Sequence, residues 1–286
     1  MRITYIGHAT LLLELGGRRI LTDPNFDLAL GRFLPRVSAP GIALEALPKL
    51  DALLLTHAHA DHLSFQSLDR LPRDVPLYAP PAVARWLDRS GYRNAVPLAP
   101  GEEAAVHGIT VRAAAARHVG SRYGFDRWRG AANMYLLETA ERTIFFAGDT
   151  ALTPDTHRLV ADRLHTGDRR LDVAMLPIGH APWWKPGFRR GHLTSADALT
   201  LFERLDARYF VPYHWGTFNH VTSTAQDAII RLRALLAAHR RAADVRILEP
   251  GEALEVEEGA ERDQAGSREA GEQGSREAGK QGSRDQ

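Results

Sequence analysis

The sequence contains no cysteine among its 286 residues. Disulfides, thiolate metal sites and cysteine nucleophiles are therefore excluded, and any bound metal must be held by nitrogen and oxygen ligands. No apolar run approaches the length of a membrane-spanning helix. The apolar stretch near the N-terminus is interrupted by Gly7 and His8, which is not the pattern of a signal peptide. We therefore expect a cytoplasmic protein without an integral membrane segment.

The sequence also has little net charge. Its formal net charge is +1, with 44% hydrophobic and 25% charged residues, the balance of an ordinary globular protein. No overall field would recruit nucleic acid, so we expect no nucleic-acid partner. The length suits one large α/β domain with a sizeable core.

The end of the chain has a different composition from the rest. After about Glu257, a GSRE or GSRD unit recurs every eight residues, with no aromatic and almost no apolar side chain. Such a segment cannot bury enough surface to order itself. We therefore predict a folded domain over residues 1–257 and a disordered low-complexity tail over residues 258–286.

Short apolar runs separated by turn residues predict a mixed α/β sandwich, because strands come first and then alternate with helices. Strands are predicted over residues 2–6, 10–15, 19–22, 52–55, 77–79, 109–115, 132–138, 143–147, 173–177, 209–212 and 245–248. Helices are predicted over residues 64–71, 81–89, 156–164, 194–205 and 223–240.

Polar clusters directly follow four of these predicted strands. They begin at His57, His118, Asp149 and His214. Residues at strand ends converge when the strands share a sheet edge, which is where ligands of α/β proteins bind. The four clusters are therefore predicted to meet in one site.

The densest cluster places three histidines and one aspartate within six positions. If this segment is extended, the two-residue spacing puts His57, His59 and Asp61 on one side. His62 then points the other way, so that one loop can serve two neighbouring metals. Imidazole and carboxylate ligands suit Zn²⁺, and also Mn²⁺ or Fe.

The other three residues each have a simpler explanation when taken alone. His118 could be a surface histidine, and Asp149 could form a turn or cap a helix. His214 could be a hydrogen-bonded core histidine. Metal ligation is favoured for all three only by their joint order along the chain.

The order of these motifs resembles the metallo-β-lactamase superfamily. That family has a HxHxDH motif after a strand, then a lone histidine, a Gly-Asp pair and a late histidine. The resemblance covers roughly residues 3–248. It implies an αββα four-layer sandwich of two mixed β-sheets flanked by helices. It also implies two metals, one held by His57, His59 and His118 and the other by Asp61, His62 and His214, with Asp149 bridging both.

Further phrases resemble a narrower group, which contains N-acyl-phosphatidylethanolamine phospholipase D and ascorbate-6-phosphate lactonase. They are YIGHATLLLEL near the start, GHLTSADA around His192, and HWGTF near the end. By this resemblance His192 contacts the substrate or supports the metals; alternatively, it is a loop histidine before a helix. Asp23 is expected to orient a metal-binding histidine through its second nitrogen, or else to form an Asp-Pro turn. His8 and His180 are weaker candidates.

The resemblance implies a zinc-dependent, dinuclear hydrolase in which a metal-bound hydroxide attacks an ester, lactone or phosphodiester. Asp61, Asp149 and His192 are the expected catalytic residues, and the substrate is a small or lipid-like molecule. One alternative is a diiron oxidoreductase, although such members usually carry an acidic residue where this chain has His59. A non-hydrolytic metal-binding protein of the same fold is another. RNA processing would need a basic substrate-binding arm, which the sequence lacks. The oligomeric state is not predicted.

Overall fold

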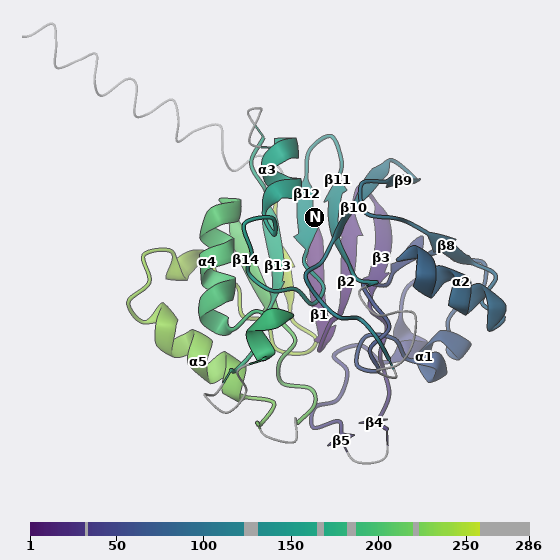
Figure 1. Cartoon of the computed structure of the whole chain (residues 1–286), viewed down its shortest axis with the longest axis horizontal. Coiled ribbons are helices and arrows are strands. Elements are labelled where there is room, and N and C mark those ends of the chain that lie inside the picture. Colours follow the sequence, from purple (N-terminus) through teal and green to yellow (C-terminus); the bar gives the residue numbers. More distant parts are fainter. Residues whose placement is uncertain (32–33, 123–130, 165–168, 182–186, 220–222, 258–286) are drawn as a thin grey trace, which may run out of the picture.

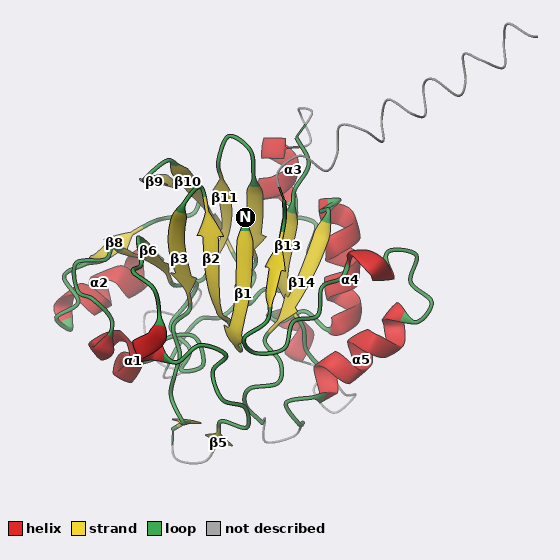
Figure 2. Ribbon diagram, turned by 180° about the vertical axis from the view of Figure 1, so that it is seen from behind, coloured by secondary structure: helices red, strands yellow, loops and turns green. Residues whose placement is uncertain are grey.

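The computed structural model describes residues 1–31, 34–122, 131–164, 169–181, 187–219 and 223–257. Two β-sheets lie face to face in the middle of the molecule, and helices cover their outer faces (Figure 1). Figure 2 shows α1 (Phe65–Arg70) and α2 (Pro81–Arg89) beside one sheet. It shows α4 (Ser195–Leu205) and α5 (Asp227–Leu236) beside the other. The αββα sandwich predicted for the chain is therefore confirmed. None of the described helices is long and apolar enough to cross a bilayer.

The first sheet has seven strands, and the first three in the chain form an antiparallel meander. Gly16 and Gly17 make the turn between the second and third strands, both with positive φ, which glycine adopts without steric cost. Three short parallel strands extend the sheet on one side. In spatial order the strands are β15 (Ala253–Glu255), β1 (Arg2–Gly7), β2 (Thr10–Leu15), β3 (Arg18–Thr22), β6 (Ala52–Leu54), β7 (Leu77–Ala79) and β8 (Ala95–Pro97).

The second sheet has six strands and changes from antiparallel to parallel pairing at β12. In spatial order the strands are β14 (Tyr209–Tyr213), β13 (Val173–Pro177), β12 (Thr143–Phe146), β11 (Asn133–Glu138), β10 (Ile109–Ala115) and β9 (Glu103–Val106). A separate two-stranded ribbon consists of β4 (Ala29–Leu30) and β5 (Leu34–Pro35).

The helices complete the layers. They are α1 (Phe65–Arg70), α2 (Pro81–Arg89), α3 (Arg158–Leu164), α4 (Ser195–Leu205) and α5 (Asp227–Leu236). Three short 3₁₀ helices cover Leu44–Ala46, Phe188–Arg190 and Ala242–Asp244. Thr194 begins α4 with a capping box, in which its side chain accepts from the backbone of Asp197 while the Asp197 carboxylate accepts from the backbone of Thr194.

The strand alternation divides the apolar residues between two cores. In β2, Leu11 and Leu13 join the large core that includes residues of both sheets. Leu12, between them, joins a second core with residues of α1 and α2. Successive side chains of a strand point to opposite faces, so one strand serves both layers. The first sheet is therefore buried on both faces, which explains its nearly continuous apolar runs.

Two predictions about the C-terminal part of the domain were wrong. Residues 245–248 form no strand: Val245 makes only an isolated bridge to Phe210, and the edge strand that pairs with β1 is β15. Of the residues predicted to be helical over 223–240, only those of α5, Asp227–Leu236, form an α-helix. It begins late because the Asp227 carboxylate accepts hydrogen bonds from the backbone and hydroxyl of Thr224, which holds the preceding residues in a turn.

The short strands β8 and β9 were not predicted, because three or four half-exposed residues carry little periodic pattern. The tail predicted over residues 258–286 lies outside the described residues.

Candidate metal centre

The four polar clusters that follow predicted strands do meet in space. His57 follows β6, His118 follows β10, Asp149 follows β12 and His214 follows β14. One of these strands belongs to the first sheet and three to the second. The site therefore lies where the carboxyl ends of strands from both sheets come together, as expected for an α/β protein.

The first group of ligands consists of His57, His59, His118 and Asp149, whose ligand atoms all lie within 4.8 Å of one another. His118 Nε2 and His59 Nδ1 are 3.1 Å apart. Two nitrogens that bind one tetrahedral zinc at its usual bond length are about 3.3 Å apart. This group therefore has the spacing that a metal ion needs.

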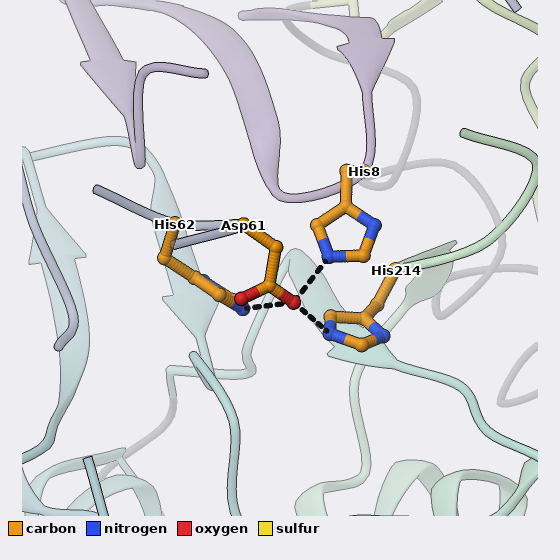
Figure 3. A group of neighbouring side chains, drawn as sticks. All are labelled: His8, Asp61, His62 and His214. Atoms are coloured by element: carbon orange, nitrogen blue, oxygen red, sulfur yellow. Dashed lines mark hydrogen bonds and ion pairs between the residues drawn. The ribbon is translucent and has the colours of Figure 1, made fainter. Parts of the chain in front are cut away.

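The second group consists of His8, Asp61, His62 and His214, whose ligand atoms also lie within 4.8 Å of one another. Figure 3 shows the three imidazoles gathered around the carboxylate of Asp61. Asp61 Oδ2 is 2.9 Å from His8 Nε2 and 3.5 Å from His214 Nε2. Three of these four residues are predicted ligands, and His8, a weaker candidate in the sequence, completes the group.

Asp149 connects the two groups. Its Oδ2 atom is 3.4 Å from His62 Nε2 and 3.5 Å from His214 Nε2, both in the second group. It is also 3.9 Å from His57 Nε2 and 4.0 Å from His118 Nε2, in the first group. A carboxylate placed between two sets of imidazoles is suited to touch a metal in each.

The side chains of the HxHxDH loop do not alternate between the two ligand groups as they would in an extended segment. Asp61 does not share a side with His57 and His59 but lies with His62 in the second group. The reason is a tight turn, in which the backbone carbonyl of His59 accepts hydrogen bonds from the amides of His62 and Leu63. The turn sends the second half of the motif towards the other group.

A buried aspartate orients two of the histidines. Asp23, fully buried, accepts a hydrogen bond from His62 Nδ1 at 2.7 Å. It also accepts from the Thr56 backbone and hydroxyl, both at 2.7 Å. The Thr56 hydroxyl oxygen in turn accepts from His57 Nδ1 at 2.9 Å. Because Nδ1 donates in both rings, Nε2 of each is the nitrogen left to bind a metal.

A backbone carbonyl orients a third histidine. His118 Nδ1 donates to the carbonyl of Gly191 at 2.7 Å, so its Nε2 is also the unprotonated nitrogen. Sequence reasoning missed both Thr56 and Gly191. The only signal for Thr56 is its position directly before His57, and nothing in the sequence pairs Gly191 with His118.

The residues present fit a metal. Among the described residues, four buried ligand atoms have no hydrogen-bond partner: His57 Nε2, His62 Nε2, His214 Nε2 and Asp149 Oδ1. Leaving buried polar atoms without partners is costly, and native proteins rarely do so. A cation in contact with all four would satisfy them, and the donor set of nitrogen and oxygen suits zinc, manganese or iron.

The two groups differ in their electrostatics. Burial, together with the neighbouring imidazoles, lowers the pKa of His118 to about 4 and that of His57 well below its ordinary value. In the second group burial also opposes charge, but the carboxylates outweigh it. They raise the pKa of His214 to about 9 and hold that of His62 well above its ordinary value. Without metal, the imidazoles of the first group are therefore neutral, whereas His62 and His214 of the second hold protons beside the ionised carboxylates of Asp61 and Asp149.

Three residues of the site have a left-handed backbone. The φ angles are 55° for His8, 34° for Asp23 and 68° for His214. In this region a side chain crowds its own backbone, so residues other than glycine adopt it uncommonly. The amide of His214 donates to the carbonyl of His8, which ties the two turns together.

The remaining candidates lie at different distances from the groups. His192 Nε2 is 3.6 Å from Asp149 Oδ2, and its ring stacks on Phe188. About a third of the His192 side chain is exposed, so it lies at the accessible side of the centre. His180 belongs to neither group, and it borders a hollow beside the second.

Comparison with known proteins identifies the family. A family model described as a β-lactamase superfamily domain matches residues 18–215, which is more than half of the chain. The chain belongs to the β-lactamase superfamily. The superfamily predicted from the HxHxDH motif is thus confirmed, and the matched segment contains all seven predicted ligands.

Two relatives show which kind of superfamily member this is. A protein of Deinococcus radiodurans described as a UPF0173 metal-dependent hydrolase is 30% identical over 258 residues, covering 90% of this chain and all of that protein. An N-acyl-phosphatidylethanolamine-hydrolyzing phospholipase D of Caenorhabditis elegans is 27% identical, covering 75% of this chain and 64% of that protein. The chain is a metal-dependent hydrolase of the superfamily.

Solved structures share the fold. An isothiocyanate hydrolase from Delia radicum gut bacteria superposes with a TM-score of 0.73 at 23% identity, covering 90% of this chain and 99% of that one. The diiron β-hydroxylase CmlA from Streptomyces venezuelae superposes with a TM-score of 0.65 at 21% identity, covering 89% of this chain and 54% of that one. Because these identities are low, the likeness shows the fold alone.

Proposed function

We propose that this superfamily member is a dinuclear zinc hydrolase that cleaves an ester, a lactone or a phosphodiester. The observation that supports the proposal is the pair of adjoining ligand groups, with Asp149 between them and with buried ligand atoms that lack partners. One group alone would suit a single structural metal. Two groups that share a carboxylate suit the paired metals of many hydrolases.

The proposed ligands follow the two groups. His57, His59 and His118 would hold the first metal, Asp61, His62 and His214 the second, and Asp149 would contact both. Zinc suits this nitrogen and oxygen donor set, and manganese or iron suits it as well. Bound metals would supply a water of lowered pKa and a positive charge that stabilises the developing oxyanion.

The remaining catalytic work would belong to the chain itself. Asp149 and Asp61 would orient the attacking water, since an ionised carboxylate can only accept hydrogen bonds from it. Burial lowers the pKa of His192, so its ring is neutral at pH 7. Its Nδ1 lies 3.3 Å from the carbonyl of Phe188, which keeps the proton on that nitrogen. Nε2 is then free to accept a hydrogen bond from the substrate or the attacking water.

The substrate class is part of our proposal, because the similar proteins do not establish it. The same groups can serve lactones, esters and phosphodiesters, because the fold does not select the substrate. The relatives' names add a phospholipid and an isothiocyanate to the substrates worth testing. A small-molecule or lipid-like substrate, like the cytoplasmic location, stays a prediction.

Elemental analysis with a hydrolysis panel on one purified sample tests the proposal. The panel holds an ester, a lactone, a phosphodiester, an isothiocyanate and a cephalosporin. We expect about two zinc per chain, and loss of activity in His59→Ala but not in His239→Ala. His239 is a suitable control because it lies beside Glu203, at 3.5 Å, in neither ligand group.

Two results would overturn the proposal. Two iron per chain with no hydrolysis would favour the alternative of a diiron oxidoreductase. CmlA, which shares the fold, is described as a diiron β-hydroxylase. A folded, zinc-reconstituted sample that retains no metal would remove the ligand assignment.

A further inference from the structure

A small hollow opens beside the second ligand group. Its volume is about 120 Å³, and His8, Asp61 and His214 form part of its lining. Residues far apart in the sequence complete it, from the β4–β5 ribbon, the end of β13 and the start of α5. Six large apolar side chains dominate the lining: Leu30, Leu34, Ile178, Phe188, Trp215 and Phe218.

The inner wall of this hollow is held in place by its own contacts. Trp215 stacks on Tyr5 with ring centroids 5.9 Å apart, and its indole nitrogen donates to the carbonyl of Pro212. The Phe218 ring packs edge-on against His8, with centroids 5.4 Å apart. Ile178, Trp215 and Phe218 are all buried. A wall of fixed aromatic and aliphatic side chains binds an apolar group without first having to be ordered.

The described residues that line the hollow include no lysine or arginine, and those that can carry a positive charge are histidines. Arg36 contacts the wall but is not a lining residue: it lies over the Phe218 ring and donates to the carbonyls of Asp27 and Asn25. A substrate with a second phosphate or carboxylate would need such a cation here.

Three larger hollows among the described residues do not compete with this one. They measure about 760, 580 and 300 Å³, and all have arginine in their lining. None is lined by a residue of the two ligand groups. Of these hollows, the small one adjoins the ligand groups, so it is the one suited to hold the part of the substrate next to the reacting bond.

We propose that this hollow binds an uncharged apolar group of the substrate, no larger than a phenyl ring or a short branched alkyl chain, next to the bond that is cleaved. An apolar cavity of about 150 Å³ is known to take benzene, which sets this upper size. The inference rests on the proposed hydrolase function. It narrows that function to small apolar esters or lactones, and away from sugar phosphates and long-chain lipids.

Esters that differ on one side of the scissile bond test the size and charge limits. We would compare kcat/KM of the zinc-loaded chain for ethyl acetate, ethyl phenylacetate, benzyl acetate, ethyl dodecanoate and monoethyl succinate. Each methylene that becomes buried should raise kcat/KM about fourfold, which corresponds to about 0.8 kcal/mol. We expect at least one benzyl compound to exceed ethyl acetate by about tenfold or more, and neither the long chain nor the carboxylate to do so.

A matched pair of variants locates the effect. Leu34→Asn places a polar group of similar size in the lining, and Leu34 is only half-buried, so the fold should tolerate the change. Leu235→Asn makes the same change on an exposed face of α5, outside this hollow. Leu34→Asn should remove most of the benzyl preference, lowering kcat/KM for the preferred benzyl compound about fivefold more than kcat/KM for ethyl acetate. Leu235→Asn should change neither.

A binding measurement separates failure of this inference from failure of the proposed function. Ligand-observed NMR would follow benzyl alcohol and glycerol with the metal-free full chain, with and without the Leu34→Asn change. We expect benzyl alcohol to bind, glycerol not to bind, and the variant to weaken binding fivefold or more. If no ester is hydrolysed but benzyl alcohol binds in this way, the hydrolase proposal fails while the apolar site stands.

The opposite results would overturn the apolar site alone. Equal turnover of all five esters, or a preference for the succinate or the dodecanoate, would show that the hollow does not select a small apolar group. Binding of benzyl alcohol that Leu34→Asn leaves unchanged would place that site elsewhere.

Discussion

Replacing Asp23 by asparagine should disable the metal centre without touching a single proposed ligand. Asp23 accepts from His62 Nδ1 and from the hydroxyl of Thr56, which itself accepts from His57 Nδ1. An amide places an NH₂ donor where one carboxylate oxygen now lies. The favourable response of the His62 ring is to move its proton from Nδ1 to Nε2, so that Nδ1 accepts from the new amide. The nitrogen that faces the metal then carries a hydrogen and cannot bind.

The expected effect of Asp23→Asn has two parts, a change in zinc affinity and a change in the stability of the fold. Removing a partner that orients a metal-binding histidine typically lowers metal affinity by about 10–100-fold, or about 1.4–2.7 kcal/mol. The fold should lose less, because burial raises the pKa of Asp23 and a neutral amide avoids the cost of burying that charge. We therefore expect a clear loss of zinc affinity with little change in the thermal midpoint of the metal-free chain.

Competition with a chromophoric chelator would measure the zinc affinity of the variant. Asp172→Asn is the control, because Asp172 also accepts from the backbone and hydroxyl of a threonine, Thr143, while its other oxygen accepts from Arg142. Asp172 lies just before β13, whereas Ile178 and the centre follow the end of that strand. Two zinc ions bound with unchanged affinity by Asp23→Asn would refute the tautomer argument.

Three further predictions concern other residues of the centre. His8→Ala removes the 2.9 Å contact to Asp61, so calorimetric titration should show the second zinc bound about tenfold more weakly and the first unchanged. His192→Gln should lower kcat about 100-fold or more while elemental analysis still finds two metals, because this side chain would assist proton transfer. In the metal-free chain burial lowers the pKa of His118 to about 4, so its contribution to stability is present above pH 6.5 and is lost as the pH falls towards 4. The carboxylates that outweigh burial at His214 raise its pKa to about 9, so its contribution is present below pH 6.5 and is lost as the pH rises through 9. Scanning fluorimetry of the metal-free chain should therefore find the highest thermal midpoint near pH 6.5, and a midpoint that rises steadily across this range would contradict the reasoning.

Most of the fold could be predicted from the sequence because its long strands are buried and their periodicity is clear. The runs at residues 10–15, 109–115 and 173–177 gave the observed bounds of β2, β10 and β13. Short edge elements were missed, since β8 and β15 have three residues each and too few apolar positions to form a pattern. The end of α5 was overestimated, because its alanine-rich continuation has helical propensity but no buried face.

The proximity of the proposed ligands could be predicted from their position after strands, but their division could not. The turn at His59 that sends Asp61 towards the second group depends on backbone hydrogen bonds that no side-chain spacing reveals. The same holds for the orientation of the rings. Gly191 is 73 residues from His118, and only the folded chain brings its carbonyl to the imidazole.

The left-handed backbone at His8, Asp23 and His214 bears on how long the protein persists in a cell. Each such residue costs roughly 1–2 kcal/mol where glycine would cost nothing, and the buried ligand atoms add to this cost. Selection for folding stability alone would not retain these three residues. If the centre holds metal as proposed, a newly made chain gains its full resistance to unfolding and proteolysis only when metal arrives. The supply of metal, and not only the rate of synthesis, would then set how much of this hydrolase persists.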